Sequence, residues 1–271
     1  MRYNKKVLQE LKSFYKKHGR HDLPWRKTYD PYKILVSEVM LQQTQVERVV
    51  PHYGAFIKKF PTASRLAVAP LSRVLAAWQG LGYNRRAKHL LGAARVIAKG
   101  GFPKKVEDIE TLPGVGRYTA RAVAAFAFNK PESFVETNIR TVIFHHYGGA
   151  FIHGPVGDAE LLPLIADLLK KSRMKPRDFY AAMMDYGAHL KKQGVRLNAK
   201  STHYRKQNKF EGSARQLRGA ILRELLKHQA TLAVLSHKIP RSKEQVALEV
   251  ARLVSEGLVA AKGKTFAISD K

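Results

Sequence analysis

Apolar residues recur three and four positions apart through most of the chain, which is the spacing of an amphipathic helix. Three such series are Val7, Leu11, Phe14 and Tyr15; Ile34, Leu35, Val39 and Met40; and Leu71, Val74, Leu75 and Trp78. The run of Ala, Val and Phe over 120–128 has no helix breaker and predicts a buried helix. Prolines such as Pro31, Pro51 and Pro70 fall between the series, where prolines commonly begin or end helices. The pattern predicts an all-α architecture of many short helices.

The last sixty or so residues follow a different pattern, with helices that lead into a hairpin. We expect helices over 214–229 and 232–237, and a third that begins after Ser242 as its N-cap. Lys262-Gly263-Lys264 then predicts a tight turn between two short strands. Three helices and a hairpin resemble a winged helix, a module that contacts either DNA or protein.

The stretch from Tyr186 to Phe210 contains no acidic residue. A solvated linker would explain its polarity, but the one-sided charge favours a strap that lies along a phosphate backbone. The residues expected to contact phosphates there are Lys191, Lys192, Arg205 and Lys206. The predicted organisation is a helical domain over 1–190, a basic linker over 191–211 and a winged-helix-like domain over 212–271.

Net charge is the bulk property that says most about the binding partner of this protein. The 271 residues include 49 Lys and Arg against 21 Asp and Glu, a net charge of +28. Such a field attracts polyanions, and it favours nucleic acid over a membrane surface or an acidic protein as the partner. No apolar run is long enough to span a bilayer, so we expect a soluble protein of the cytoplasm or nucleoid. We also expect a monomer. The absence of cysteine excludes disulfides and thiolate metal sites.

A glycine pair between two expected helices is the strongest local signal, in Leu112-Pro113-Gly114-Val115-Gly116. Glycines let the backbone turn tightly and approach a ligand closely, and the next helix presents free N–H groups to an anion. A plain helical hairpin would also use two glycines, but the charge of the chain favours phosphate. The predicted phosphate contacts at this hairpin and nearby are Gly114, Gly116, Arg117, Thr119 and Lys88.

Several blocks in order resemble the signature blocks of MutY-type adenine DNA glycosylases, within the endonuclease III superfamily. The blocks are Leu23-Pro24-Trp25-Arg26, Ser37 to Gln45, Gly80-Leu81-Gly82-Tyr83, Leu112 to Gly116, and Ala182 to Gly187. The resemblance covers residues 1–190 and implies a two-lobed helix-hairpin-helix fold. It also implies excision of a mispaired base from double-stranded DNA, with adenine opposite 8-oxoguanine or guanine as the leading substrate.

The resemblance implies that Glu38 is the general acid that protonates the leaving base. Glu38 lies among apolar residues, and burial would raise its pKa and keep it protonated. For the carboxylate that stabilises the sugar cation, the family usually has Asp where this chain has Glu136, although the neighbouring Asn138 matches. The extra methylene adds about 1.5 Å of reach, and a misplacement of about 1 Å can cost on the order of 100-fold in rate.

Other residues take roles from the same resemblance. Tyr118 stands where bifunctional members have a lysine for a Schiff base, which implies base removal without strand cleavage. Gln43 and Tyr83 match the wedge that enters the base stack when a base is extruded. The residues that match the base pocket are Trp25, Arg26 and Asp185, of which Asp185 serves a structural role as readily as a catalytic one.

Two features of the family are missing from this chain. The resemblance would place four cysteines of an iron–sulfur cluster after Gly187, and the chain has none. A winged-helix-like segment stands where the family has a Nudix-like domain. The histidines do not cluster with carboxylates at the spacing of metal ligands. We therefore expect no cofactor and no metal.

Two alternatives stay open. The same scaffold could remove uracil, thymine or an oxidised pyrimidine from a mismatch. A catalytically weak protein that binds DNA lesions is the other alternative, because Glu136 replaces Asp and the cluster is missing.

Overall fold

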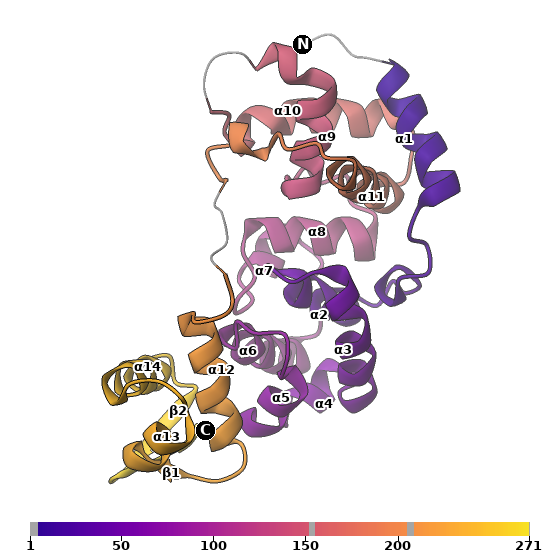
Figure 1. The fold of residues 1–271 in the computed structure, drawn as a ribbon. Coiled ribbons are helices and arrows are strands. Elements are labelled where there is room, and N and C mark those ends of the chain that lie inside the picture. Colours follow the sequence, from indigo (N-terminus) through magenta and orange to yellow (C-terminus); the bar gives the residue numbers. More distant parts are fainter. Residues whose placement is uncertain (1–4, 152–154, 205–208, 271) are drawn as a thin grey trace. The chain divides into compact units, whose positions relative to one another are not determined.

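The computed structural model describes residues 5–151, 155–204 and 209–270 and is mostly helical, as predicted (Figure 1). The chain forms two compact units, each built from three separate segments. Unit 1 comprises 1–38, 104–111 and 115–206, and unit 2 comprises 39–103, 112–114 and 207–271. The predicted boundaries near 190 and 211 remain a prediction. Among the described residues, no helix combines the length and apolarity needed to cross a membrane.

In the described residues of unit 1, the regular elements are helices, and one isolated bridge joins Val156 and Ser201. Its elements are α1 (Lys5–His18), η1 (Pro24–Arg26), most of α2 (Pro31–Leu41), α7 (Val106–Glu110), α8 (Arg117–Phe128), α9 (Thr137–Tyr147), η2 (Gly148–Ala150), α10 (Asp158–Ser172), α11 (Pro176–Lys192) and η3 (Asn198–Lys200). On α1, Val7 and Leu11 of the first apolar series are buried in the core, and Phe14 and Tyr15 pack against it.

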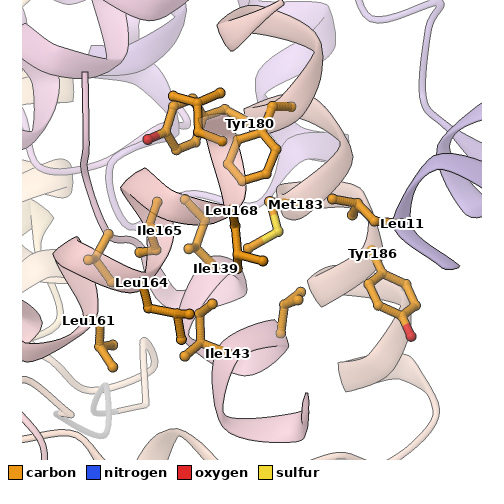
Figure 2. Packing of buried hydrophobic residues seen from close by; sticks show 14 of the residues in the cluster. Leu11, Ile139, Ile143, Leu161, Leu164, Ile165, Leu168, Tyr180, Met183 and Tyr186 are labelled. Atoms are coloured by element: carbon orange, nitrogen blue, oxygen red, sulfur yellow. The ribbon is translucent and has the colours of Figure 1, made fainter. Parts of the chain in front are cut away.

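Helices α9 and α11 pack directly against each other in the core of unit 1. Ile139, Ile143 and Met183 meet there as buried side chains (Figure 2). Each contributes about 1.5–3 kcal/mol to folding relative to an exposed position. At the crossing, a Cβ on Gly187 would lie 2.1 Å from the carbonyl oxygen of Asn138, so only glycine permits this approach. That contact fixes the N-terminal end of α9, which carries two predicted site residues.

Unit 2 joins four helices from the first half of the chain to the C-terminal segment. Its elements are α3 (Val46–Lys59), α4 (Ala63–Ala67), α5 (Leu71–Trp78), α6 (Arg85–Gly100), α12 (Ala214–Leu225), β1 (Ala230–Thr231), α13 (Leu232–Lys238), α14 (Lys243–Ser255), β2 (Val259–Lys262) and β3 (Thr265–Ile268). The strands form an antiparallel sheet in the order β1-β3-β2, with Val259 opposite Ile268.

The C-terminal segment has the predicted three helices and hairpin, with one addition. Ser242 caps α14 as expected, and its hydroxyl and the Gln245 side chain form a reciprocal capping box. Helix α12 ends at Leu225 rather than 229, and the chain then adds β1, where Ala230 pairs with Phe266. A strand of two residues leaves no alternating pattern in the sequence, so the third strand was not predicted.

Two sets of hydrogen bonds tie the C-terminal segment to the earlier helices of unit 2. The Asp270 carboxylate accepts from the backbone N–H and the hydroxyl of Ser72, at 2.7 and 2.8 Å. The Lys88 ammonium donates to the Glu256 carbonyl at 2.6 Å. The winged-helix-like segment therefore belongs to one compact unit with residues 39–103.

One expectation about local structure was wrong. Pro51 lies inside α3 and does not end a helix. Proline has no N–H, so the helix loses only the hydrogen bond to the Glu47 carbonyl. Glu47 lies in the exposed first turn, where water can donate to that carbonyl instead. The basic stretch is ordered from Tyr186 to residue 204 and is not a free linker there. Helix α11 continues to Lys192, and the backbone of Lys200 and Thr202 is hydrogen-bonded to that of Val156.

Candidate active site

Glu38 is a buried carboxyl group in the helical core of unit 1 and lies on α2, with 6% of its surface exposed. The Tyr118 hydroxyl donates to its Oε2 at 3.3 Å. Burial raises the pKa of Glu38 to about 7, and the charge of Glu136 adds to this, while Tyr118 and Arg26 oppose it. A substantial fraction of Glu38 therefore holds its proton at neutral pH, as a general acid requires.

Tyr118 remains a neutral hydrogen-bond donor beside Glu38. It is the second residue of α8, and its ring meets Phe134 edge-on at 5.6 Å. Burial and the charges of Glu38 and Glu136 raise the pKa of Tyr118 well above its usual value. The hydroxyl can thus donate to an ionised Glu38 after that residue has lost its proton.

Glu136 is the N-cap of α9 and folds its side chain back onto the helix. Its Oε1 accepts from the backbone N–H groups of Asn138 and Ile139 at 2.7 and 2.9 Å. Burial raises the pKa of Glu136, and these two amides together with Lys191 and Arg140 counteract the rise. The longer side chain therefore caps the helix as aspartate commonly does.

Asn138 completes the pair of residues at the start of α9. Its side-chain amide donates to Oε2 of Glu136 at 3.2 Å. Its buried Oδ1 accepts no hydrogen bond from any residue that the structure describes. A buried acceptor of this kind is costly unless water or a ligand satisfies it.

Asp185 is held between two arginines. Its carboxylate accepts from the Arg26 guanidinium at 2.5 and 2.9 Å, and from Nε and the backbone N–H of Arg20 at 2.6 and 2.8 Å. Burial alone would raise the pKa of Asp185, but the hydrogen bonds and charges of Arg26 and Arg20 outweigh it and lower the pKa. Both carboxylate oxygens are engaged, which favours the structural role for Asp185. Arg20 was not predicted.

The predicted pocket residues Trp25 and Arg26 lie on η1. A second arginine that was not predicted, Arg177, holds them in place. Arg177 is buried and donates to the carbonyl oxygens of Trp25, Arg26 and Phe126. It thereby connects η1 to the C-terminal end of α8. Its guanidinium also lies 4.1 Å from the centre of the Tyr29 ring. No local sequence pattern marks Arg177, because its partners are backbone atoms more than fifty positions away.

The predicted wedge residues Gln43 and Tyr83 belong to unit 2 and share an unusual backbone conformation. Their φ angles are +55° and +48°, in the left-handed region that costs a residue other than glycine about 1–3 kcal/mol. A buried arginine, Arg86, compensates for this strain. It donates to the carbonyls of Val39, Met40, Gln42, Leu81 and Gly82.

Arg86 therefore fixes both turns that carry wedge residues. It lies 5.5 Å from the Trp78 ring and 5.3 Å from the Tyr83 ring, measured to the ring centres. Burial lowers the pKa of Arg86 to about 10, so it remains charged at neutral pH. Arg86 was not predicted as a site residue, because in the sequence it is only the second of two adjacent arginines.

The predicted phosphate contacts have different environments. Gly114 has φ +76°, and a Cβ there would meet His89 at 2.5 Å, so glycine is required. Gly116 caps α8, and Arg117 at its start is exposed. Thr119 is buried, which disfavours its predicted phosphate contact.

The other basic residues also differ among themselves. Lys88 donates to the Glu256 carbonyl, and Lys191 is half-buried and interacts electrostatically with Glu136, so neither ammonium is a simple surface charge. Lys192 is exposed. Arg205 and Lys206 lie outside the described residues.

The chain does not fit an iron–sulfur cluster, because it has no cysteine to supply thiolate ligands. Within the part of the chain that the structure describes, no three His, Asp or Glu side chains gather as a metal site would require.

Comparison with known proteins gives consistent matches. A family model described as "HhH-GPD superfamily base excision DNA repair protein" matches residues 36–152. The adenine DNA glycosylase of Mycolicibacterium smegmatis is 40% identical over 233 residues, which cover 79% of this chain and 78% of that protein. The human adenine DNA glycosylase is 38% identical over 191 residues, 66% of this chain but 34% of that longer protein.

Solved structures show the same fold. A thermostable thymine-DNA glycosylase is similar with a TM-score of 0.60 and 33% identity, over 68% of this chain and 85% of that one. An endonuclease III in a trapped covalent complex with DNA is similar with a TM-score of 0.55 and 20% identity, over 68% of this chain and 84% of that one. The latter similarity concerns the fold alone.

Proposed function

The chain belongs to the HhH-GPD superfamily of base excision DNA repair proteins, and on this basis we propose that it is a monofunctional adenine DNA glycosylase. The observation that carries the proposal is Glu38, a buried carboxyl group with a pKa raised to about 7 that is hydrogen-bonded to Tyr118. A purine leaves its sugar readily only when it is protonated, and a carboxyl group that is still protonated at neutral pH supplies that proton.

Glu136 and Asn138, at the start of α9, act after the base has been protonated. As the bond between base and sugar breaks, positive charge develops on the sugar, and the Glu136 carboxylate stabilises it. Asn138 has a buried Oδ1 without a hydrogen bond from the described residues. It is suited to accept one from the water that attacks the sugar. Tyr118 carries no amine, so no Schiff base forms at that position and the DNA strand stays intact.

DNA binding rests on charge and on the wedge. The net charge of +28 and the exposed Arg117 and Lys192 favour contacts with phosphates. Gln43 and Tyr83, which Arg86 holds in place, would enter the gap that the extruded base leaves.

A second candidate function has one observation in its favour. The similar thermostable protein is a thymine-DNA glycosylase by its description, so removal of a mispaired thymine or uracil is the alternative. A pyrimidine leaves more readily as an anion and depends less on a protonated acid. The raised pKa of Glu38 therefore favours the purine.

A single-turnover assay on four duplexes tests the proposal. They contain adenine opposite 8-oxoguanine, adenine opposite guanine, and uracil or thymine opposite guanine. We expect loss of adenine, with strand breaks that appear only after hot alkali. Product from the pyrimidine duplexes alone would support the second candidate. Binding without product from any of the four would indicate a lesion-binding protein instead.

The rate of base removal should depend on pH through both carboxyl groups. Glu38 acts in its protonated form, so with a pKa of about 7 the rate should fall about tenfold per pH unit above 7. Glu136 acts when ionised, and burial raises its pKa, so the rate should also fall on the acid side. A single-turnover profile from pH 4.5 to 9 measures both limbs.

Tyr118 provides the control for this profile, because its hydroxyl lowers the pKa of Glu38. Tyr118→Phe should move the alkaline limb to higher pH. A limb that stays in place would contradict the assignment of that limb to Glu38.

Glu136→Asp should slow base removal by about 10- to 100-fold. Aspartate also caps helices well, so we expect the helix to remain, but its carboxylate is about 1.5 Å shorter in reach. The measurement is the single-turnover rate, with the thermal midpoint as a check that α9 is intact. A faster reaction in Glu136→Asp would mean that the site is still shaped for the shorter side chain.

A further inference from the structure

The turn from Gly80 to Tyr83, just before α6, has an unusual backbone that needs support at both ends. Gly80, Gly82 and Tyr83 have φ angles of +91°, +70° and +48°, all in the left-handed region. The carbonyl oxygens of such a turn lack the N–H partners that a helix would give them, so other donors must hold them. Arg86 holds those of Leu81 and Gly82, near the end of the turn.

The start of the turn is held by His52, a half-buried residue of α3. Its Nε2 lies 2.9 Å from the Gln79 carbonyl oxygen, and its Nδ1 lies 2.8 Å from the Arg48 carbonyl oxygen one helical turn earlier. A Cβ on Gly80 would lie 2.7 Å from Nε2, which shows how closely the ring sits over the turn. The imidazole therefore links α3 directly to the turn that carries Tyr83.

The two partners of the His52 ring limit its protonation state. Both are carbonyl oxygens, which only accept hydrogen bonds. A neutral imidazole has one N–H, so it can donate to one of them, and the lone pair of its other nitrogen would then face the second oxygen. The imidazolium ion has two N–H groups and satisfies both. The geometry therefore suits the protonated ring.

We propose that His52 is a positioning residue for Tyr83, and that it completes the link between α3 and the turn as the imidazolium ion. The inference rests on the proposed function, because a wedge matters only where a base is extruded. Arg86 supports the end of the turn and His52 its start. Without the ring, Tyr83 is held from one side only and loses its orientation for entry into the base stack.

Other charged and titratable groups surround this link, and they stay constant in the test. Those that line the surface beside Gln79 and Gly80 are Glu47, Arg48, Tyr83, Arg215, Arg223 and Arg241. Helix α5, which packs on α3, contributes Arg73. Because none of these residues is changed in the variants below, a difference between the variants reports on position 52 alone.

The test follows base extrusion in full-length protein with Glu38→Gln, a background that limits base removal. The probe is a duplex with adenine opposite guanine and with 2-aminopurine beside the adenine, whose fluorescence rises when stacking is lost. His52→Asn keeps a donor near the position of Nδ1 but cannot reach the Gln79 carbonyl. At pH 6 it should lower the equilibrium constant for extrusion about tenfold, the scale of one hydrogen bond to a charged group.

The dependence on pH separates a proton-dependent link from simple packing. With His52 present, extrusion should weaken between about pH 6 and 8, where an imidazolium ion gives up its proton. With His52→Asn this part of the profile should be absent. His237→Asn makes the same change at an exposed histidine on α13 of the same unit, and it should leave the profile as it is.

His52→Gln is the rescue variant. Its amide nitrogen can take the place of Nε2 and donate to the Gln79 carbonyl at any pH and without charge. It should restore extrusion at pH 8 to at least the level seen with His52, and it should remove the pH dependence.

Three results would overturn the inference. Equal extrusion with His52 and with His52→Asn would show that the ring does not position the wedge. A profile with His52 that is flat from pH 6 to 8 would show that the link does not need the imidazolium ion. Failure of His52→Gln to restore extrusion would assign the loss to charge or packing. Because extrusion is measured without base removal, a chain that behaves as expected here but releases no base with Glu38 intact would refute the proposed function alone.

Discussion

Glu38→Gln is expected to slow base removal by about 10²- to 10⁴-fold while leaving DNA binding within about twofold. Glutamine has the same shape as the protonated carboxyl group but cannot give up a proton, so the loss corresponds to general acid catalysis. The site suits this role because burial raises the pKa of Glu38 to about 7. Single-turnover rates and equilibrium binding on the same adenine-containing duplex measure the two quantities separately.

The matched control is Glu110→Gln, an identical change at an exposed position on α7 of the same unit. It should leave both quantities unchanged. Normal turnover by Glu38→Gln would refute the acid assignment, and the raised pKa of Glu38 would then be a consequence of burial alone.

Asp185→Ala is expected to lower the free energy of unfolding by about 3–5 kcal/mol, the cost of removing one partner from a buried ion pair. The Asp185 side chain is 2% exposed and that of Arg26 is 11%, so water cannot readily replace the lost carboxylate. Arg26 would be left charged without its principal partner. Urea unfolding followed by circular dichroism measures the change, and the thermal midpoint should fall by about 10 °C.

Asp167→Ala is the control for this prediction. Asp167 also pairs with a cation, Lys171, but both side chains are about 40% exposed. Its removal should cost less than about 1 kcal/mol. Equal effects for the two variants would mean that Asp185 and its arginines are well solvated in solution, contrary to the packing described here.

The sequence predicted the parts of the site that lie in short contiguous motifs. The apolar residues around Glu38 indicated its burial and a raised pKa, and the structure has both. Ser242 was likewise predicted as an N-cap from a short local pattern, because a capping box depends on residues only three positions apart. Local patterns therefore predicted most helices of both units and the burial of Glu38, while the catalytic roles stay predictions.

The sequence could not predict contacts made to backbone atoms or across long separations. Arg86 acts through carbonyl oxygens, which every residue possesses, so nothing in the residue types points to it. Arg20 and Asp185 meet across 165 positions. The left-handed turn at Gln43 was also invisible, because glutamine rarely adopts it and tertiary contacts impose the conformation.

The long separation between Arg20 and Asp185 has a consequence for how the protein is made. Helix α1 packs on α11, so its buried residues Val7, Leu8 and Leu11 have no surface to cover them until α11 has been synthesised. At about 5–20 residues per second, a ribosome needs roughly 10–30 s to add the 165 intervening positions. During that interval the apolar face of this amphipathic helix stays uncovered and is open to non-native contacts.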